Sequence, residues 1–86
     1  MIGADTCGFA GNTDEELCNR WMALSAWHPF YRNHNVLLAL SQEPYRWDSV
    51  AEVSRKVIAA RLRLLPLWQT IFARASEKGT PAIRTL

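Results

Sequence analysis

Long apolar runs and one-sided charge are both missing from this chain of 86 residues. No uninterrupted apolar stretch approaches the roughly 20 residues that a membrane-spanning helix needs. The net charge is only +2, and like charges do not gather into long runs. Because phosphate binding needs several clustered cations, this charge gives no indication of a nucleic-acid partner. We therefore expect neither a membrane span nor a nucleic-acid ligand.

A secretory signal, internal repeats and low-complexity tracts are also lacking. The opening MIGADTCGFAG has no basic stretch followed by an apolar core, so we expect no signal peptide in it. The composition, 49% apolar and 21% charged, is that of one small globular domain. Four tryptophans in so short a chain need a large surface to pack against, so we expect part of that surface to come from outside the chain.

Cysteine is scarce, and the two that are present, Cys7 and Cys18, lie eleven positions apart. Metal-binding hooks use the short Cys-x-x-Cys spacing, so a metal site is the least favoured interpretation. Free thiols and a disulfide both remain open. We predict no metal and no cofactor.

The first helix is predicted from a capping box. Thr13 and Glu16 form a Thr-x-x-Glu pair, so a helix should begin near Asp14 and run to about Trp27, where Pro29 stops it. We expect one face of this helix to be buried, and its apolar stripe consists of Leu17, Trp21 and Leu24.

A long helical pattern fills the second half of the chain. Asp48 or Ser49, together with Glu52, offers a second capping signal. Pro66 must kink or break this helix, because its ring removes a hydrogen bond and clashes with the preceding turn. The pattern then resumes, and Gly79 is placed to close it in a left-handed conformation.

Short extended segments are predicted around these helices. Residues 30–34 suit a strand, residues 41–47 a loop, and residues 82–86 the start of another strand. Strands separated by helices indicate a parallel sheet. Such a sheet needs more strands than this chain supplies.

Two polar residues are candidates for ligand binding. Asp5 lies on the predicted loop before the first helix, where α/β folds carry ligand-binding groups, and a turn-capping role is an equal alternative. His34, within RNHN, is either a ligand contact or a structural histidine. We assign no role to His28. A position at a helix start explains the acids Asp14, Glu15 and Glu16 without catalysis.

The long helix is basic, and it suggests an alternative function. Its six cations could bind an acidic partner or a membrane surface, which would make the chain a non-enzymatic basic helical interaction module. Arg61, however, falls on the apolar face, so we predict that it reaches a carboxylate or backbone carbonyls. The six are Arg55, Lys56, Arg61, Arg63, Arg74 and Lys78.

Six blocks carry a resemblance to a known family: GADTCGF, GNTDEELCNRWM, PFYRNHN, QEPYRW, LLP and GTPAIR. In that order they resemble glycoside hydrolase family 31, the α-glucosidase family, from residue 3 to residue 86. The resemblance implies an α/β fold that is a partial (β/α)₈ TIM barrel, namely its last two βα units, helix-rich as an isolated chain. Residues 1–79 would be the C-terminal part of the catalytic barrel, and residues 80–86 the start of the following β-sandwich domain.

The resemblance also implies a function. Family members hydrolyse α-glucosidic bonds with retention, using an aspartate nucleophile and an aspartate acid/base. Both of those blocks lie upstream of the matching part, so we expect a fragment of a retaining α-glucosidase that is inactive alone, with the rest of the parent enzyme as its partner.

By resemblance, Asp5 and His34 bind hydroxyls of an α-glucoside or oligosaccharide substrate, and Phe9 lines the same site. Members that pass through the secretory pathway look bridged at the positions of Cys7 and Cys18, so the resemblance implies a disulfide between these two residues. The resemblance therefore also suggests a secretory or extracellular location.

Overall fold

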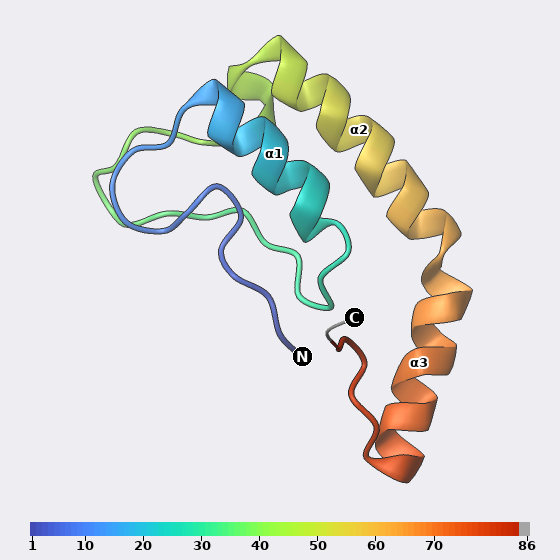
Figure 1. Cartoon of the computed structure of the whole chain (residues 1–86). Helices are drawn as coiled ribbons and strands as arrows, with labels where there is room; N and C mark the ends of the chain where they lie inside the picture. The colour runs from blue at the N-terminus through green and yellow to red at the C-terminus, as the bar shows by residue number, and fades with distance from the viewer. Residues whose placement is uncertain (85–86) are drawn as a thin grey trace.

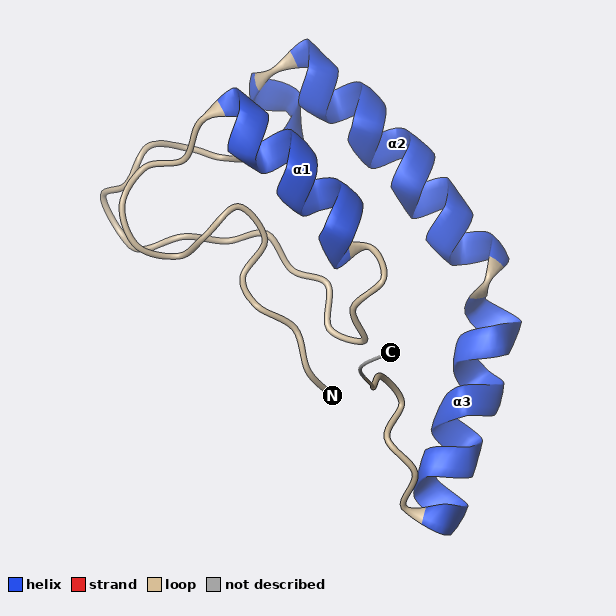
Figure 2. Cartoon of the chain, viewed as in Figure 1, coloured by secondary structure: helices blue, strands red, loops and turns tan. Residues whose placement is uncertain are grey.

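The computed structural model describes residues 1–84, in which three α-helices and one short 3₁₀ helix follow one another. Helices α1 and α2 pack side by side, and α3 continues from the end of α2 in a different direction (Figure 1). The remainder of the described chain is loop (Figure 2). The elements are α1 (Glu15–Ser25), η1 (Pro44–Arg46), α2 (Asp48–Arg63) and α3 (Leu65–Lys78).

Helix α1 begins where the sequence predicts, but through a different cap. The carboxylate of Asp14 accepts a hydrogen bond from the backbone N–H of Leu17 at 2.9 Å, so Asp14 is the N-cap. The predicted capping box is wrong because Glu16 instead accepts hydrogen bonds from Arg20, one turn along the helix. The helix ends at Ser25, slightly before the predicted end.

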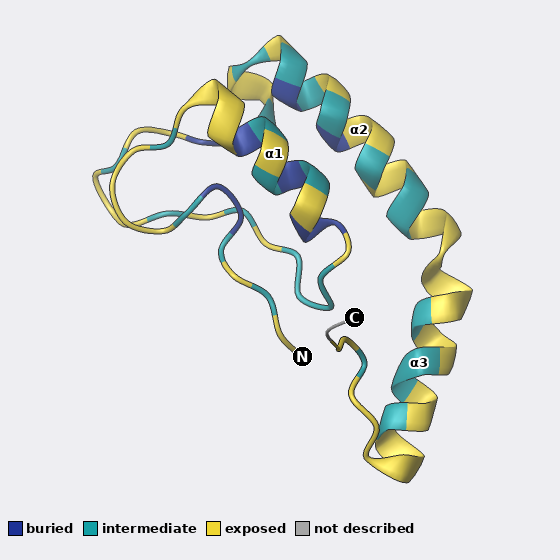
Figure 3. Cartoon of the chain, in the orientation of Figure 1, coloured by how far each residue is buried: buried dark blue, intermediate teal, exposed yellow. Residues whose placement is uncertain are grey.

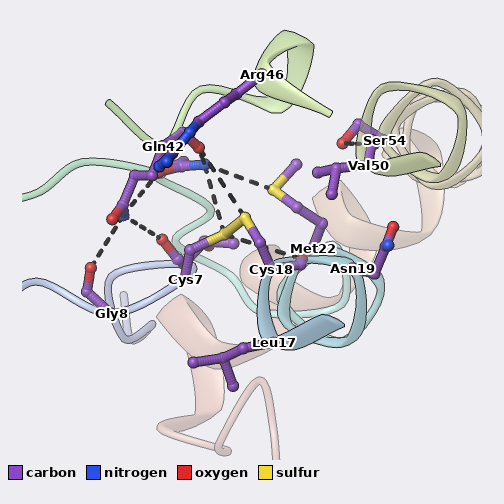
Figure 4. The surroundings of a disulfide bond; sticks show 12 residues. Cys7, Gly8, Leu17, Cys18, Asn19, Met22, Gln42, Arg46, Val50 and Ser54 are labelled. Carbon is purple, nitrogen blue, oxygen red and sulfur yellow. Dashed lines mark hydrogen bonds between the residues drawn. A yellow bond between two sulfur atoms is a disulfide. The ribbon is translucent and has the colours of Figure 1, made fainter. Parts of the chain in front are cut away.

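The buried face of α1 is not the predicted one. Leu17 is 43% exposed and Leu24 is 60% exposed, and Figure 4 shows Leu17 pointing away from the disulfide. The helix is turned so that its neighbouring face meets α2 and the extended segments, because a disulfide fixes the helix there (Figure 3). The buried residues of α1 are Cys18, Met22 and Ser25.

Helix α2 starts without the predicted side-chain cap. Its N-cap residue is Trp47, whose side chain makes no capping hydrogen bond. The Ser49 hydroxyl instead donates to Glu15 and accepts a hydrogen bond from the Asn19 amide, which joins the starts of α1 and α2. The polar residue that signalled a cap therefore serves the packing of two helices.

The two predicted boundaries of the last helix are confirmed. Helix α2 ends at Arg63, and Pro66 stands in the first turn of α3, where its missing N–H costs no helical hydrogen bond. Gly79 has φ 68°, and its N–H donates to the carbonyl of Ala75 at 2.9 Å. Gly79 is thus the left-handed C-cap that the sequence predicts.

Two extended segments run side by side in parallel. Thr6 and Asn33 form a parallel bridge, and the N–H of Thr6 donates to the carbonyl of Arg32 at 2.8 Å. The N–H of Phe30 donates to the carbonyl of Ile2 at 3.1 Å in the same register. The parallel relationship that the sequence predicts is therefore present.

The predicted strand over residues 30–34 is nevertheless wrong as a regular strand. Across residues 1–84 the parallel pairing amounts to an isolated bridge, because each segment has one neighbour and few ladder bonds to hold it extended. Residues 82–84 form no strand either, and residues 85–86 lie outside the described part. The predicted pair of βα units is thus seen as helices with one bridge, and the domain boundary after residue 79 stays a prediction.

The described chain is open. Its radius of gyration is 14.4 Å, against about 12 Å for a compact domain of this length. Its accessible surface is 6235 Å², against about 5,200 Å² for a compact protein of this mass. Within residues 1–84 no helix is long and apolar enough to cross a membrane. The shape is elongated, with principal-axis extents of 42, 24 and 23 Å.

Candidate functional site

Asp5 lies opposite Arg32 in the parallel pairing, one position before the bridge. The Arg32 guanidinium donates to one carboxylate oxygen, Oδ1, from Nε at 3.1 Å and from Nη2 at 2.7 Å. The second oxygen, Oδ2, is 3.2 Å from Nε2 of His34. The hydrogen bond from Arg32 holds the pKa of the Asp5 carboxyl below its ordinary value, so Asp5 is a carboxylate at neutral pH.

An aromatic ring completes the cluster. The rings of Phe9 and His34 have centroids 5.2 Å apart and planes inclined by 41°. A backbone hydrogen bond also holds the two segments together next to the cluster, because the N–H of Val36 donates to the carbonyl of Phe9 at 3.0 Å. Phe9 is 45% exposed, so the cluster is open to a ligand.

A tight turn carries the chain from Asp5 into α1. The N–H of Gly8 donates to the carbonyl of Asp5 at 2.9 Å, and both Cys7 and Gly8 have positive φ, at 71° and 87°. A residue with a side chain resists that conformation. A disulfide joins Cys7 to Cys18 in α1, with their Cα atoms 4.7 Å apart, and so ties the turn to the helix (Figure 4).

Gly3 allows the two extended segments to approach. A Cβ atom at this position would stand 1.9 Å from the carbonyl oxygen of Phe30, which is far inside van der Waals contact. The register that sets Asp5 against Arg32 therefore depends on the absence of a side chain at Gly3.

Arg61 reaches carbonyls, as the sequence predicts, but away from the cluster. Its Nη1 donates to the carbonyls of Ala26 and His28, at 2.5 and 2.6 Å, and its Nη2 to the carbonyl of Pro29 at 3.0 Å. Its guanidinium also lies over the ring of Trp68, 5.1 Å from the centroid. Arg61 thus joins α2 to the turn that leads into the second extended segment.

The predicted binding residues Asp5, Phe9 and His34 are therefore brought together, and Arg32 joins them. Sequence reasoning missed Arg32, because only the register of the two segments sets it against Asp5. A carboxylate accepts hydroxyl protons, an imidazole exchanges hydrogen bonds with hydroxyls, and an aromatic ring offers an apolar face. Together these groups suit a small polyhydroxylated ligand.

Other features of the described residues do not belong to this cluster. No group of three or more His, Cys, Asp or Glu within residues 1–84 is arranged to hold a metal ion. An apolar groove of about 470 Å³ lies between the N-terminal segment, α3 and the tail after it. None of Asp5, Phe9, Arg32 and His34 lines that groove.

Residues 1–71 match the model of the TIM-barrel domain of glycosyl hydrolases family 31. The chain is 62% identical over 86 residues to the alpha-glucosidase of Schizosaccharomyces pombe and 57% identical over 86 residues to that of Aspergillus oryzae. It is 54% identical over 84 residues to Glucoamylase 1 of Schwanniomyces occidentalis. These matches cover 98% to 100% of this chain and 9% of each relative, so the chain spans about a tenth of their length.

Proposed function

Because the chain belongs to glycoside hydrolase family 31, we propose that residues 1–79 form the C-terminal part of the catalytic barrel of a retaining α-glucosidase. Residues 80–86 would lead into the next domain. In this proposal Asp5 and His34 bind hydroxyls of the terminal glucosyl unit, and Phe9 packs against the same sugar. The observation that carries the proposal is the contact of Asp5 with both Arg32 and His34 at one open edge.

We propose that the nucleophile and the acid/base are supplied from outside this chain. Retaining hydrolysis needs two carboxyl groups about 5 Å apart, one to attack and one to protonate the leaving oxygen. Asp14 caps α1, Glu16 pairs with Arg20, and Glu52 pairs with Lys56, which accounts for these carboxylates structurally. The chain alone then orients a sugar without cleaving it, and we expect no turnover from it.

The test is a hybrid enzyme, in which residues 1–86 replace the matching segment of the S. pombe alpha-glucosidase. We expect the hybrid enzyme to hydrolyse a chromogenic α-glucoside. Asp5→Asn and His34→Ala should each lower its kcat/KM by about 10- to 100-fold, which corresponds to a lost charge-assisted hydrogen bond of about 1.5–3 kcal/mol.

A matched control separates sugar binding from folding. Asp14→Asn also removes an aspartate charge, but asparagine caps helices as well as aspartate does, so activity should stay within about twofold. An inactive hybrid enzyme, or full activity in Asp5→Asn, would overturn the proposal. Turnover by the isolated chain would overturn the assignment of the catalytic carboxylates to other parts of the protein.

The alternative, a basic helical module that binds acidic partners, finds less support. Arg61 is turned inward onto carbonyls, and Lys56 is paired with Glu52 at 2.6 Å. Two of the six cations of the basic helix are thereby already engaged. An acidic peptide that binds the chain with an affinity falling steeply with salt would favour this alternative.

We also propose a secretory or extracellular location for the parent enzyme. The disulfide between Cys7 and Cys18 supports it, because such bonds persist in oxidising compartments. Mass spectrometry of the native protein under non-reducing conditions tests it. Free thiols at both positions would argue for a reducing compartment.

A further inference from the structure

Gln42 is one of few polar side chains that are buried, with 3% of its surface exposed, although it belongs to a segment that reads as loop. Its side-chain Nε2 lies 2.9 Å from the carbonyl oxygen of Gly8 and 3.0 Å from Oδ1 of Asn33. The carbonyl oxygens of Thr6 and His34 are farther, at 3.2 and 3.4 Å. Figure 4 shows this amide beside the disulfide, with a dashed line to Gly8.

The orientation of the Gln42 amide is fixed by these neighbours. An amide nitrogen carries two hydrogens and no acceptor, so the two nearest oxygens can each receive one. A flipped amide would place Oε1 against four acceptor oxygens. Asn33 reinforces the arrangement, because its Nδ2 donates back to the backbone carbonyl of Gln42 at 2.9 Å. Gln42 and Asn33 thus form a reciprocal pair.

The atoms that Gln42 binds are next to every residue of the candidate site. The carbonyl of Thr6 follows Asp5, the carbonyl of Gly8 precedes Phe9, and Asn33 lies between Arg32 and His34. One buried amide therefore bridges the turn with the carboxylate and the segment with the imidazole. The parallel pairing alone joins these two parts by an isolated bridge.

We propose that Gln42 is a positioning residue, which fixes the separation of the Asp5 turn from the His34 segment and so sets the shape of the sugar site. This rests on the proposed function. Burial makes the bridge strong, because losing the amide leaves several carbonyls without a donor. A displacement of about 1 Å in such a site is enough to cost about 100-fold in rate.

The test compares three variants of the hybrid enzyme. Gln42→Leu removes both donors and keeps the size of the side chain, so we expect kcat/KM to fall by about 10- to 100-fold. Ser54→Ala is the matched control. Ser54 is also buried, and its hydroxyl donates to the carbonyl of Val50 within α2. We expect Ser54→Ala to leave kcat/KM within about twofold.

Gln42→Glu gives a readout that general loss of stability does not move. A carboxylate facing four oxygens is repelled, whereas its protonated form keeps the size and one donor. Relative to the parent hybrid enzyme, its activity should therefore rise as the pH is lowered. The charged groups on the flanking segments, Asp5, Arg32, His34, Glu43 and Arg46, are the same in both proteins, so the ratio isolates residue 42.

The outcomes separate the two proposals. An inactive parent hybrid enzyme contradicts the proposed function. If the parent hybrid enzyme is active and Gln42→Leu folds with a kcat/KM within twofold of it, only the positioning role is overturned. The positioning role is also overturned if Ser54→Ala lowers kcat/KM as much as Gln42→Leu does. If Gln42→Leu does not fold, the test is the activity of Gln42→Glu divided by that of the parent hybrid enzyme, measured against pH. A ratio that does not change with pH overturns the positioning role. Failure of both variants to fold would show that Gln42 serves folding alone and would also overturn it.

Discussion

Arg32 donates two hydrogen bonds to a single oxygen of Asp5 and leaves the other oxygen to His34. The guanidinium thus orients the carboxylate while one of its oxygens stays near the open edge of the cluster. A carboxylate held in this way needs no rearrangement before it accepts a hydroxyl proton. The arrangement is pre-organised for a polar ligand.

The Asp5 carboxyl should lose its charge at higher pH when Arg32 is removed. Since the hydrogen bond from Arg32 lowers the pKa of Asp5, Arg32→Met should raise it. Inhibition of the hybrid enzyme by glucose should weaken as the pH falls and Asp5 becomes protonated. In the Arg32→Met variant this weakening should begin at a higher pH than in the parent hybrid enzyme. The exposed Arg20→Met, which breaks the pair with Glu16, is the control. Superimposable pH profiles would contradict this prediction.

The same pair links stability to pH. The pKa of Asp5 is lower in the folded chain than in the unfolded chain. The contribution of Asp5 to the free energy of unfolding is therefore fully present above the pKa that Asp5 has in the unfolded chain. It is lost as the pH falls through the lowered folded value. We expect the stability difference between the hybrid enzyme and its Arg32→Met variant to shrink in acid, as measured by thermal unfolding against pH.

Arg61→Met should destabilise the hybrid enzyme by about 2 kcal/mol, because three carbonyls lose a charged donor. Arg61→Lys should recover part of this, since an ammonium group cannot reach all three in the planar geometry of the guanidinium. Thermal unfolding measures the effect. Arg63→Met, at an exposed position near the end of α2, is the matched control. An unchanged midpoint in Arg61→Met would mean that these bonds contribute nothing.

Removing the disulfide with the double substitution Cys7→Ala and Cys18→Ala should cost about 3 kcal/mol, because the closed loop restricts the unfolded chain. The turn at Cys7 should also loosen, since its positive φ is then no longer held by the link to α1. Denaturant unfolding with and without reductant checks the value. A reductant effect that persists in the double variant would place the cause elsewhere.

The isolated chain should be molten or prone to aggregate. Its open shape leaves large apolar side chains in water, among them Leu37 at 86% and Leu38 at 96% exposure. We expect strong binding of a hydrophobic dye and weak near-ultraviolet circular dichroism. A monomer with a cooperative thermal transition and sharp tertiary signals would contradict this expectation.

Local chemistry allowed the sequence to predict the helix boundaries. Pro66 and Gly79 act through their own backbone, so their effects do not depend on distant residues. Arg61 was also predictable, because a cation on an apolar face must find a partner. The buried face of α1 was not, since the disulfide through Cys18 and the packing of Met22 override the more apolar stripe.

The residues of the candidate site also fall into those that the sequence predicts and those that it does not. Asp5, Phe9 and His34 were predicted as binding residues from the family resemblance, and their grouping in space follows from two parallel segments. Arg32 and Gln42 were missed. The pairing of Arg32 depends on register, and a single glutamine in a loop carries no periodic signal. The proposed role of Gln42 depends on four oxygen atoms around its side-chain amide, which two separate segments contribute.

The pairing of Asp5 with Arg32, and of Thr6 with Asn33, has a constant offset of 27 positions. The intervening stretch is nevertheless no free spacer, because it carries Phe9 of the candidate site, the disulfide to Cys18 and the two carbonyls, of Ala26 and His28, that bind Arg61. A slip of one residue in this pairing would turn Asp5 to the opposite face, because side chains alternate along an extended segment. The disulfide would pass the same slip on to α1, so the chain has a single register in which both the carboxylate and the helix are in place.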